Sequence, residues 1–226
     1  MNGILILLLL VLASALPGII VFIWFHARKS AVTLPWFLLS ITAGVVSLLA
    51  AAFIQRFFPS KQDGLGALFF GVFVRIALVE ELGRLAVLIP LFAAANHARK
   101  TDTPFGAALG LVAGLGFAIL ENAFHGIADI YITLLRAFTA APLHGACGIQ
   151  AGVAVFLFSK NRGKAFFHFI SAVLIHGAYN LIIISPALPS ALAIIIALSA
   201  LFASLPLLKT TGTDHENSFS PTRFLP

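Results

Sequence analysis

The sequence predicts an all-α protein that crosses a membrane as a bundle of about seven transmembrane helices. Hydrophobic residues make up 60% of the 226-residue chain, charged residues make up 10%, and the mean hydropathy is +1.05. Soluble globular proteins carry about 25% charged residues, so this composition excludes a water-soluble domain. The high apolar content also excludes a disordered chain. The net charge of +6 comes from short, scattered basic clusters, which gives no stripe for nucleic acid.

Seven apolar runs account for the predicted number of helices. Each is long enough to cross a hydrocarbon core of about 30 Å at about 1.5 Å per residue. In chain order they span residues 4–25, 34–54, 65–95, 104–125, 130–158, 165–184 and 187–208. The fifth run is long and contains Pro142, which predicts a kink or a tilted helix in it. We therefore expect one transmembrane domain over residues 1–208 and a disordered cytoplasmic tail over 209–226.

The positions of lysine and arginine predict the orientation of the bundle. With the N-terminus outside, the inside segments hold nine basic residues and the outside segments hold two, Arg56 and Lys61. The nine inside residues are Arg28, Lys29, Arg99, Lys100, Lys160, Arg162, Lys164, Lys209 and Arg223. Cytoplasmic loops carry the excess of basic residues in membrane proteins, so we expect an N-out, C-in topology.

Ionisable residues at bilayer depth indicate where the function lies. A charge there costs about 2.5–3.5 kcal/mol on insertion scales, so it needs a compensating role. The third run contains Glu80, Glu81 and Arg84. Glu80 and Arg84 are four residues apart and can pair on one helix face, which is the better spacing, and the pairing of Glu81 with Arg84 stays open as the alternative. A structural salt bridge needs only one glutamate, so the second carboxylate is free to act as a general base or a metal ligand.

The next three runs place further polar residues in the membrane. Glu121 and Asn122 lie near the outer end of the fourth run, where Glu121 could also be merely interfacial. His144 lies deep in the fifth run, and His176 and Asn180 share a face of the sixth at four-residue spacing. We expect the histidines and Glu121 to meet the paired glutamates in one cavity that opens outward.

A cluster of carboxylates and imidazoles in a membrane cavity is suited to hydrolysis. Such ligands hold Zn²⁺, which lowers the pKa of its bound water to about 7. The sequence contains neither an HExxH nor a GxSxG motif, so a metal site would be assembled from separate helices. Asn180 or Arg84 could donate a hydrogen bond to the oxyanion of a tetrahedral intermediate. The single cysteine, Cys147, is interpreted as a small core residue.

Four motifs in order resemble the PrsW family of intramembrane proteases. They are Glu80-Glu81-x-x-Arg84, Phe117-x-x-x-Glu121-Asn122, an isolated His144 and His176-x-x-x-Asn180. The family belongs to a wider group with the CAAX prenyl proteases. Those proteases usually place the arginine one residue later and a histidine where Glu121 stands, so the chain is closer to PrsW. It departs from the PrsW type at Arg84, where lysine is the residue we expect more often.

The resemblance implies a polytopic membrane protease that cuts a membrane-bound, single-pass protein within or beside the bilayer. The best-known role of the family, the first cut of an anti-sigma factor, further implies a bacterial inner membrane. The implied catalytic residues are Glu80, Glu81, Arg84, Glu121, Asn122, His144, His176 and Asn180. The implied mechanism is either metal-assisted, with Zn²⁺ on His144, His176 and Glu121, or metal-free and glutamate-dependent. In the working hypothesis Glu80 activates water and Asn180 stabilises the oxyanion.

Other functions remain open at this stage. An ion- or proton-coupled transporter would also carry intramembrane Glu, His and Arg, although the chain lacks the paired broken helices of an inverted repeat. A CAAX-type prenyl-protein protease would use related motifs. A haem protein could use His144 and His176 as axial ligands, which would leave the paired glutamates unexplained. A noncatalytic subunit could keep the same fold.

Overall fold

The fold is given by a computed structural model that describes residues 3–58, 64–98, 102–127, 130–185 and 187–209. Within these residues every regular element is helical, which confirms the predicted fold class. The first helices are α1 (Gly3–Ala27), α2 (Leu34–Gln55), and α3 (Leu65–Phe69), which continues through the π-helix η1 (Phe70–Leu78) into α4 (Val79–Ala98). The others are α5 (Thr103–His125), α6 (Ile130–Phe138), α7 (Ala140–Leu157), α8 (Arg162–Ile184), and α9 (Ala191–Ser204) with the 3₁₀ turn η2 (Leu205–Leu208). The predicted tail from residue 210 onward lies outside the described residues.

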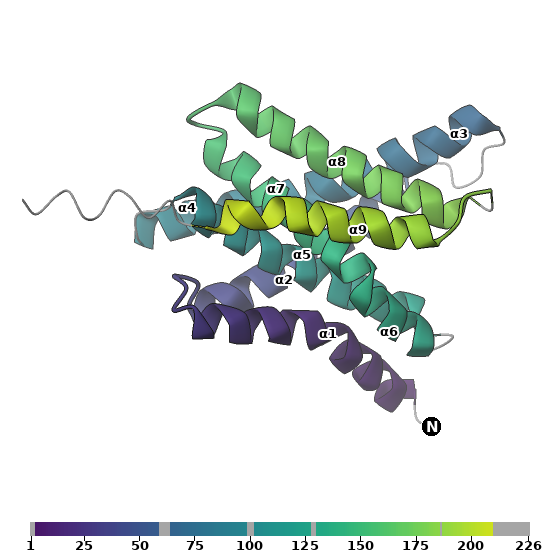
Figure 1. Cartoon of the computed structure of the whole chain (residues 1–226), viewed down its shortest axis with the longest axis horizontal. Coiled ribbons are helices and arrows are strands. Elements are labelled where there is room, and N and C mark those ends of the chain that lie inside the picture. The colour runs from purple at the N-terminus through teal and green to yellow at the C-terminus, as the bar shows by residue number, and fades with distance from the viewer. Residues whose placement is uncertain (1–2, 59–63, 99–101, 128–129, 186, 210–226) are drawn as a thin grey trace, which may run out of the picture.

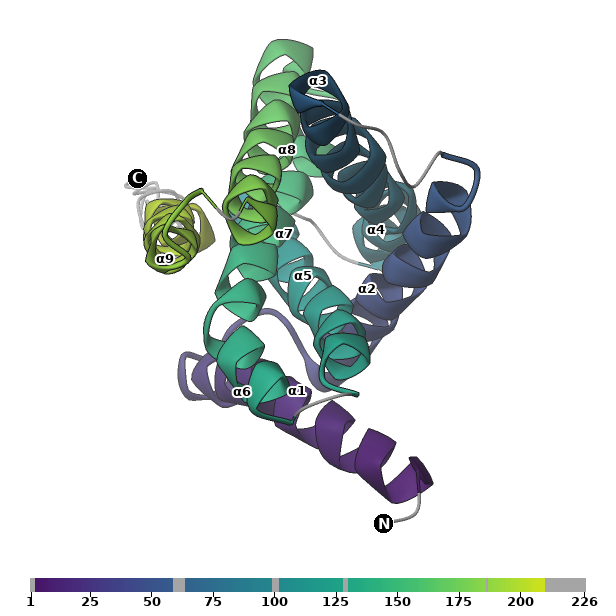
Figure 2. The same cartoon turned by 90° about the vertical axis from the view of Figure 1, so that its right-hand side faces the viewer.

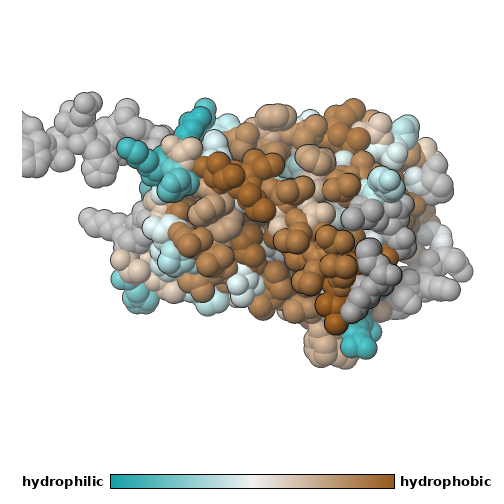
Figure 3. All heavy atoms as spheres, turned by 90° about the horizontal axis from the view of Figure 1, so that it is seen from below, coloured by the Kyte–Doolittle hydropathy of each residue, from teal (hydrophilic) through white to brown (hydrophobic). Residues whose placement is uncertain are grey.

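Each predicted apolar run becomes one helix or one stack of consecutive helices, and these run up and down the bundle (Figure 1). Six stretches of the described chain are long and apolar enough to cross a membrane. The stack of α3, η1 and α4 is the seventh segment of the bundle. Hydrophobic residues cover the middle of the face shown in Figure 3, and hydrophilic residues lie toward its ends. Such a surface is typical of helices that face lipid.

The two ends of the bundle differ in their basic residues. The α1–α2 loop, the α7–α8 loop and the end of η2 lie at one end, on the left in Figure 1. These segments carry Arg28, Lys29, Lys160, Arg162 and Lys209. Successive loops alternate between the two ends of the bundle, as the predicted topology requires. Which side of a membrane this end faces stays a prediction.

Helices α5 and α7 form the centre of the bundle. In each of the two stretches that contain them, 78% of the most apolar window is buried, against 17–18% for α1 and α9. Glycines let their backbones touch. A Cβ atom added to Gly110 would collide with the carbonyl oxygen of Gly148, and one added to Gly114 would collide with that of His144. Small residues at this spacing allow close helix packing in lipid, and here the contact fixes the backbone of His144 against α5.

The break predicted in the fifth apolar run is present, and it lies at Thr139. This residue has φ −121° and ψ −63°, and it separates α6 from α7. Pro142 is the third residue of α7. A proline is tolerated in the first helical turn, because the N–H that it lacks has no intrahelical partner there. The break lets α6 take its own direction beside the end of α5 (Figure 2).

Candidate active site in the bundle interior

Six of the predicted site residues meet in the interior of the bundle. They come from four helices: Glu80, Glu81 and Arg84 from α4, Glu121 from α5, His144 from α7 and His176 from α8. The imidazole rings of His144 and His176 lie 5.0 Å apart, measured between centroids. All except Glu121 are more than nine-tenths buried. The Glu121 side chain is 21% exposed and marks the open edge of the site.

Arg84 pairs with Glu81, and the expected pair with Glu80 is not formed. Nη1 of Arg84 donates to both carboxylate oxygens of Glu81, which lies three residues earlier and is therefore also a helix neighbour. Both side chains are fully buried. The guanidinium carbon of Arg84 also lies 4.9 Å from the centroid of the Phe117 ring. Glu81 and Phe117 thus hold the guanidinium of Arg84 in the core between α4 and α5. Glu80 is the glutamate that does not pair with it.

Glu80 faces two other helices. Its Oε1 accepts a hydrogen bond from Nε2 of Gln55 on α2, at 2.9 Å. Its Oε2 lies 3.5 Å from Nε2 of His176. This oxygen is buried and has no hydrogen-bond partner in the part of the chain that the structure describes. A buried polar atom without a partner costs about 1–3 kcal/mol, so a further donor or a cation fits here.

His176 is oriented by the other glutamate. Its Nδ1 lies 2.9 Å from Oε1 of Glu81. An imidazole that donates Nδ1–H to a carboxylate keeps its lone pair on Nε2, where it can accept a proton or bind a metal. The π-helix η1 packs closely beside this residue, because a Cβ atom on Gly177 would collide with the ring of Phe73. The two glutamates therefore differ in their other partners: Glu81 pairs with Arg84, and Glu80 accepts a hydrogen bond from Gln55. Both carboxylates also lie close to His176.

His144 bridges Arg84 and Glu121. Its Nε2 lies 2.7 Å from Oε2 of Glu121, and its Nδ1 lies 3.4 Å from Nη2 of Arg84. An arginine can only donate hydrogen bonds. Nδ1 of His144 is therefore the acceptor, and Nε2 carries the proton toward Glu121. The two histidines thus present different tautomers to the interior of the site.

Arg136 on α6 is a site neighbour that the sequence analysis did not select. Its Nη2 lies 2.7 Å from Oε2 of Glu121, and its Nε donates to Oδ1 of Asn122 at 3.0 Å. Asn122 is fully buried. The available signal was the pair Thr133 and Arg136, three residues apart on one face of an otherwise apolar segment. It was missed because the break at Thr139 was not placed.

Asn180 is the predicted site residue that stands apart. It lies one turn beyond His176 on α8 and is only partly buried. Its side chain makes no hydrogen bond to another described residue, so its amide is available. Cys147 is buried, and its Sγ lies 3.6 Å from the carbonyl oxygen of Ala172. This environment agrees with its interpretation as a core residue.

The donors of the site suit a metal ion chemically. Imidazole nitrogens and carboxylate oxygens are zinc ligands, and the unpartnered Oε2 of Glu80 beside Nε2 of His176 is a place for a cation. Among the residues described, however, no group of three or more His, Cys, Asp or Glu side chains is arranged to hold one. His144 and Glu121 stand at hydrogen-bonding distance from each other. The zinc ligands His144, His176 and Glu121 therefore stay a prediction.

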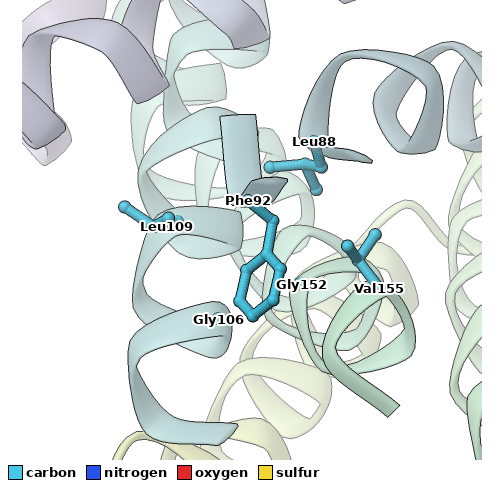
Figure 4. A pocket seen from close by; sticks show the side chains of 6 residues that line it. All are labelled: Leu88, Phe92, Gly106, Leu109, Gly152 and Val155. Carbon is cyan, nitrogen blue, oxygen red and sulfur yellow. The ribbon is translucent and has the colours of Figure 1, made fainter. Parts of the chain in front are cut away.

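A separate pocket between α4, α5 and α7 has no polar side chain. It is a shallow gap that is too narrow to hold a water molecule (Figure 4). Its lining consists of Leu88, Phe92, Gly106, Leu109, Gly152 and Val155. It lies toward the basic end of α5 and α7, away from the ionisable cluster. The pocket therefore offers no side chain for acid–base chemistry.

Comparison with known proteins identifies the family of the chain. A family model described as PrsW family intramembrane metalloprotease matches residues 28–205, which is most of the chain and includes every residue of the cluster. No curated protein and no solved structure significantly resembles the chain. The match and the apolar helices together identify an integral, multi-pass membrane protein with an intramembrane protease domain. The chain belongs to the PrsW family of intramembrane metalloproteases.

Proposed function

We propose that the protein is an endopeptidase that hydrolyses a peptide bond of a membrane-bound protein, with Glu80 as the general base. The observation that supports this assignment is the buried, unpartnered Oε2 of Glu80, 3.5 Å from Nε2 of His176. A water molecule beside these two atoms would meet two proton acceptors. General bases act at about 2.6–3.2 Å from the proton that they remove.

Glu81 and Arg84 support this base without touching the water. Glu81 fixes the tautomer of His176 and stabilises the imidazolium when His176 takes up a proton, as a carboxylate does in a catalytic triad. Arg84 balances the charge of Glu81, so Glu81 stays ionised while buried. The two adjacent glutamates thus divide the work. Glu80 removes the proton and Glu81 orients the imidazole.

His144 and Glu121 form the second acid–base pair of the proposal. The proton that His144 carries on Nε2 is available to the leaving amine, and Glu121 stabilises the charged form of the ring. The free amide of Asn180, one turn from His176, is the proposed donor to the oxyanion. Each role is assigned to a side chain that stands in or beside the cluster.

A metal is compatible with the same donor set. The residues predicted to hold Zn²⁺ are His144, His176 and Glu121; a metal on Nε2 of His144 would take the place of the proton that this atom donates to Glu121. The chemistry that a bound Zn²⁺ supplies is Lewis-acid polarisation of the water and of the scissile carbonyl. Glu80 and Glu81 keep their tasks in either case, because Glu80 takes the proton and Glu81 holds His176, whereas His144 and Glu121 act as an acid–base pair only without the metal.

The proposal includes an outward-facing site in the inner membrane of a bacterium. Two features support this orientation. The basic loops gather at one end of the bundle, and Glu121, the most exposed member of the cluster, lies near the C-terminal end of α5, which is the opposite end. The proposed substrate is a single-pass membrane protein, of which an anti-sigma factor is one example.

A reconstituted cleavage assay tests the function. Purified wild type is placed in phosphatidylethanolamine and phosphatidylglycerol liposomes with a pool of single-span reporter proteins, randomised on both sides of the transmembrane segment. Glu80→Gln is compared with Leu82→Ala, a matched control on the lipid-exposed side of the same helix. We expect cleavage by wild type and by Leu82→Ala, and a loss of at least about 100-fold in Glu80→Gln.

Two results would contradict the proposal in different ways. Full cleavage by Glu80→Gln would remove the general-base assignment and leave the protease standing. No cleavage of any reporter by wild type, together with ion-dependent uptake into the liposomes, would replace the protease with a transporter.

A further inference from the structure

We infer that Arg136 is a positioning residue of the protease site, holding Glu121 and Asn122 from the short helix α6. The inference rests on the proposed function, because it assigns Arg136 a task in the same reaction. Arg136 is not part of the four motifs that identify the site. Its role follows from its contacts, its burial and the way α6 is mounted on the bundle.

The first contact fixes the carboxylate of Glu121. Oε2 of Glu121 lies 2.7 Å from Nη2 of Arg136 and also 2.7 Å from Nε2 of His144. This one oxygen is thus held by His144 on the inner side of the site and by Arg136 at its outer edge. The Arg136 side chain is only 14% exposed, so water screens this pair weakly. The other nearby cation candidate, His125, is 3.7 Å from Oε1 and more than half exposed.

The second contact fixes the amide of Asn122. Nε of Arg136 donates to Oδ1 at 3.0 Å, while Nδ2 is buried and has no partner among the described residues. Turning the amide over would place its NH₂ group against another donor. Arg136 therefore decides which way the amide points, and it leaves the buried Nδ2 of Asn122 as an unused N–H donor. An arginine can hold both neighbours because its planar fork carries several donors.

The packing of α6 against the end of α5 supports both contacts of Arg136. The hydroxyl of Thr133, one turn before Arg136, donates to the carbonyl oxygen of Asn122 at 3.2 Å. A Cβ atom on Gly126 would collide with this hydroxyl, so Gly126, the residue that follows α5, lies directly against Thr133 of α6. Of the other side chains of α6, Tyr131, Leu135 and Phe138 are exposed, and Ala137 is buried. α6 thus turns a narrow polar face to the end of α5 and an apolar face outward.

A positioning role for Arg136 and a role in helix packing alone predict different effects of its loss. α6 lies against both α1 and α5, so packing alone gives no reason for a guanidinium here, and a charge within the membrane is otherwise unfavourable. If Arg136 positions Glu121, its loss slows the chemical step more than it weakens substrate binding. Removing a residue that orients a catalytic group costs about 10- to 100-fold in activity.

The test uses full-length protein in the reporter assay described above, with the reporter that wild type cleaves fastest. We expect Arg136→Gln to lower kcat by about 10- to 100-fold with KM nearly unchanged. Arg136→Lys should recover part of this loss, because an ammonium can hold Glu121 but not both partners. Leu135→Ala, on the exposed side of the same helix, is the matched control and should behave as wild type.

A second measurement does not depend on protease activity. In protein labelled with ¹⁵N-histidine, the His144 side-chain signal is identified by its loss in His144→Gln. We expect Arg136→Gln to shift this signal, Arg136→Lys to shift it less, and Leu135→Ala to leave it in place. If Arg136→Gln aggregates, Arg136→Lys serves for both measurements.

The outcomes separate the two proposals. Wild-type cleavage with an unchanged kcat in Arg136→Gln, a loss confined to KM, or an unmoved His144 signal would each overturn the role of Arg136 alone. A wild type that cuts no reporter would overturn the proposed function, and the His144 signal would still decide whether Arg136 positions the cluster.

Discussion

The two adjacent glutamates should respond to neutralisation in opposite ways. Glu81→Gln removes the only carboxylate that pairs with Arg84 within the described residues, and both side chains are fully buried. Glu80→Gln removes a carboxylate whose hydrogen bond from Gln55 can be kept by the amide oxygen. We expect Glu81→Gln to lose stability, and Glu80→Gln to lose activity with little change in stability.

The magnitude follows from the burial of the pair. Removing one partner of a buried ion pair costs about 3–5 kcal/mol, because the other charge is left uncompensated. Glu81 also accepts a hydrogen bond from Nδ1 of His176, worth about 0.5–1.5 kcal/mol net and adding to the loss. Replacing both partners, as in Glu81→Gln with Arg84→Met, removes the stranded charge. The double variant should therefore be more stable than Glu81→Gln alone.

Unfolding by SDS titration in mixed micelles measures these differences. The five proteins to compare are wild type, Glu80→Gln, Glu81→Gln, Arg84→Met and the double variant, with retention of helix followed by circular dichroism. A loss below about 1 kcal/mol in Glu81→Gln would show that the buried charge of Arg84 finds another partner. A double variant as unstable as the sum of its single changes would refute the pair as a coupled unit.

Three further predictions concern packing, metal content and topology. Gly114→Ala should destabilise the bundle by about 1–3 kcal/mol and reduce cleavage, because the added Cβ collides with the carbonyl oxygen of His144. The SDS titration measures this loss, and Gly71→Ala is its control, because a Cβ at Gly71 meets open space. Mass spectrometry of purified wild type should find about one zinc per chain, lost when both site histidines are replaced by alanine. Zinc retained by that variant would rule out the histidine ligands, and no metal in either protein would leave the glutamate-dependent scheme. In a cysteine-free background, a membrane-impermeant maleimide added outside cells should label Arg56→Cys and spare Lys160→Cys; the reverse pattern would contradict the N-out topology.

The helices could be predicted from the sequence because lipid imposes a simple rule. Each crossing needs a long apolar run, and the seven runs match the helices of the structure. The membership of the site was also accessible, because Glu80, His144 and His176 are ionisable residues where ionisable residues are costly. Their convergence is what the common depth of these residues led us to expect.

The pairing inside the site could not be read from spacing. Glu80 and Glu81 both lie within reach of Arg84 on one helix, and the choice between them depends on neighbours from other helices. Gln55 and His176 draw Glu80 away, while Phe117 and His144 surround the guanidinium. These neighbours are separated from Arg84 by tens of residues in sequence, so only the tertiary structure reveals them.

The position of Arg136 was hidden for a different reason. Within one long apolar run, an arginine near the end of the membrane resembles an interfacial anchor. Its meaning changes once the run is divided at Thr139, because α6 then lies against the end of α5. A break set by a single backbone conformation leaves little trace in composition.

The glycine contact between α5 and α7 has a consequence for how such proteins can diversify. Two members of the site, Glu121 and His144, lie on the two most buried helices of the bundle, whereas α1 and α9 are mostly exposed on its outside. The family match begins at residue 28, immediately after α1 ends. Because α1 lies outside this match whereas α9 lies within it, α1 is the peripheral helix that can be exchanged, lengthened or lost while the reactive groups keep their mutual geometry. Selection can then alter which neighbours the enzyme meets in the plane of the membrane without altering the chemistry that it performs on them.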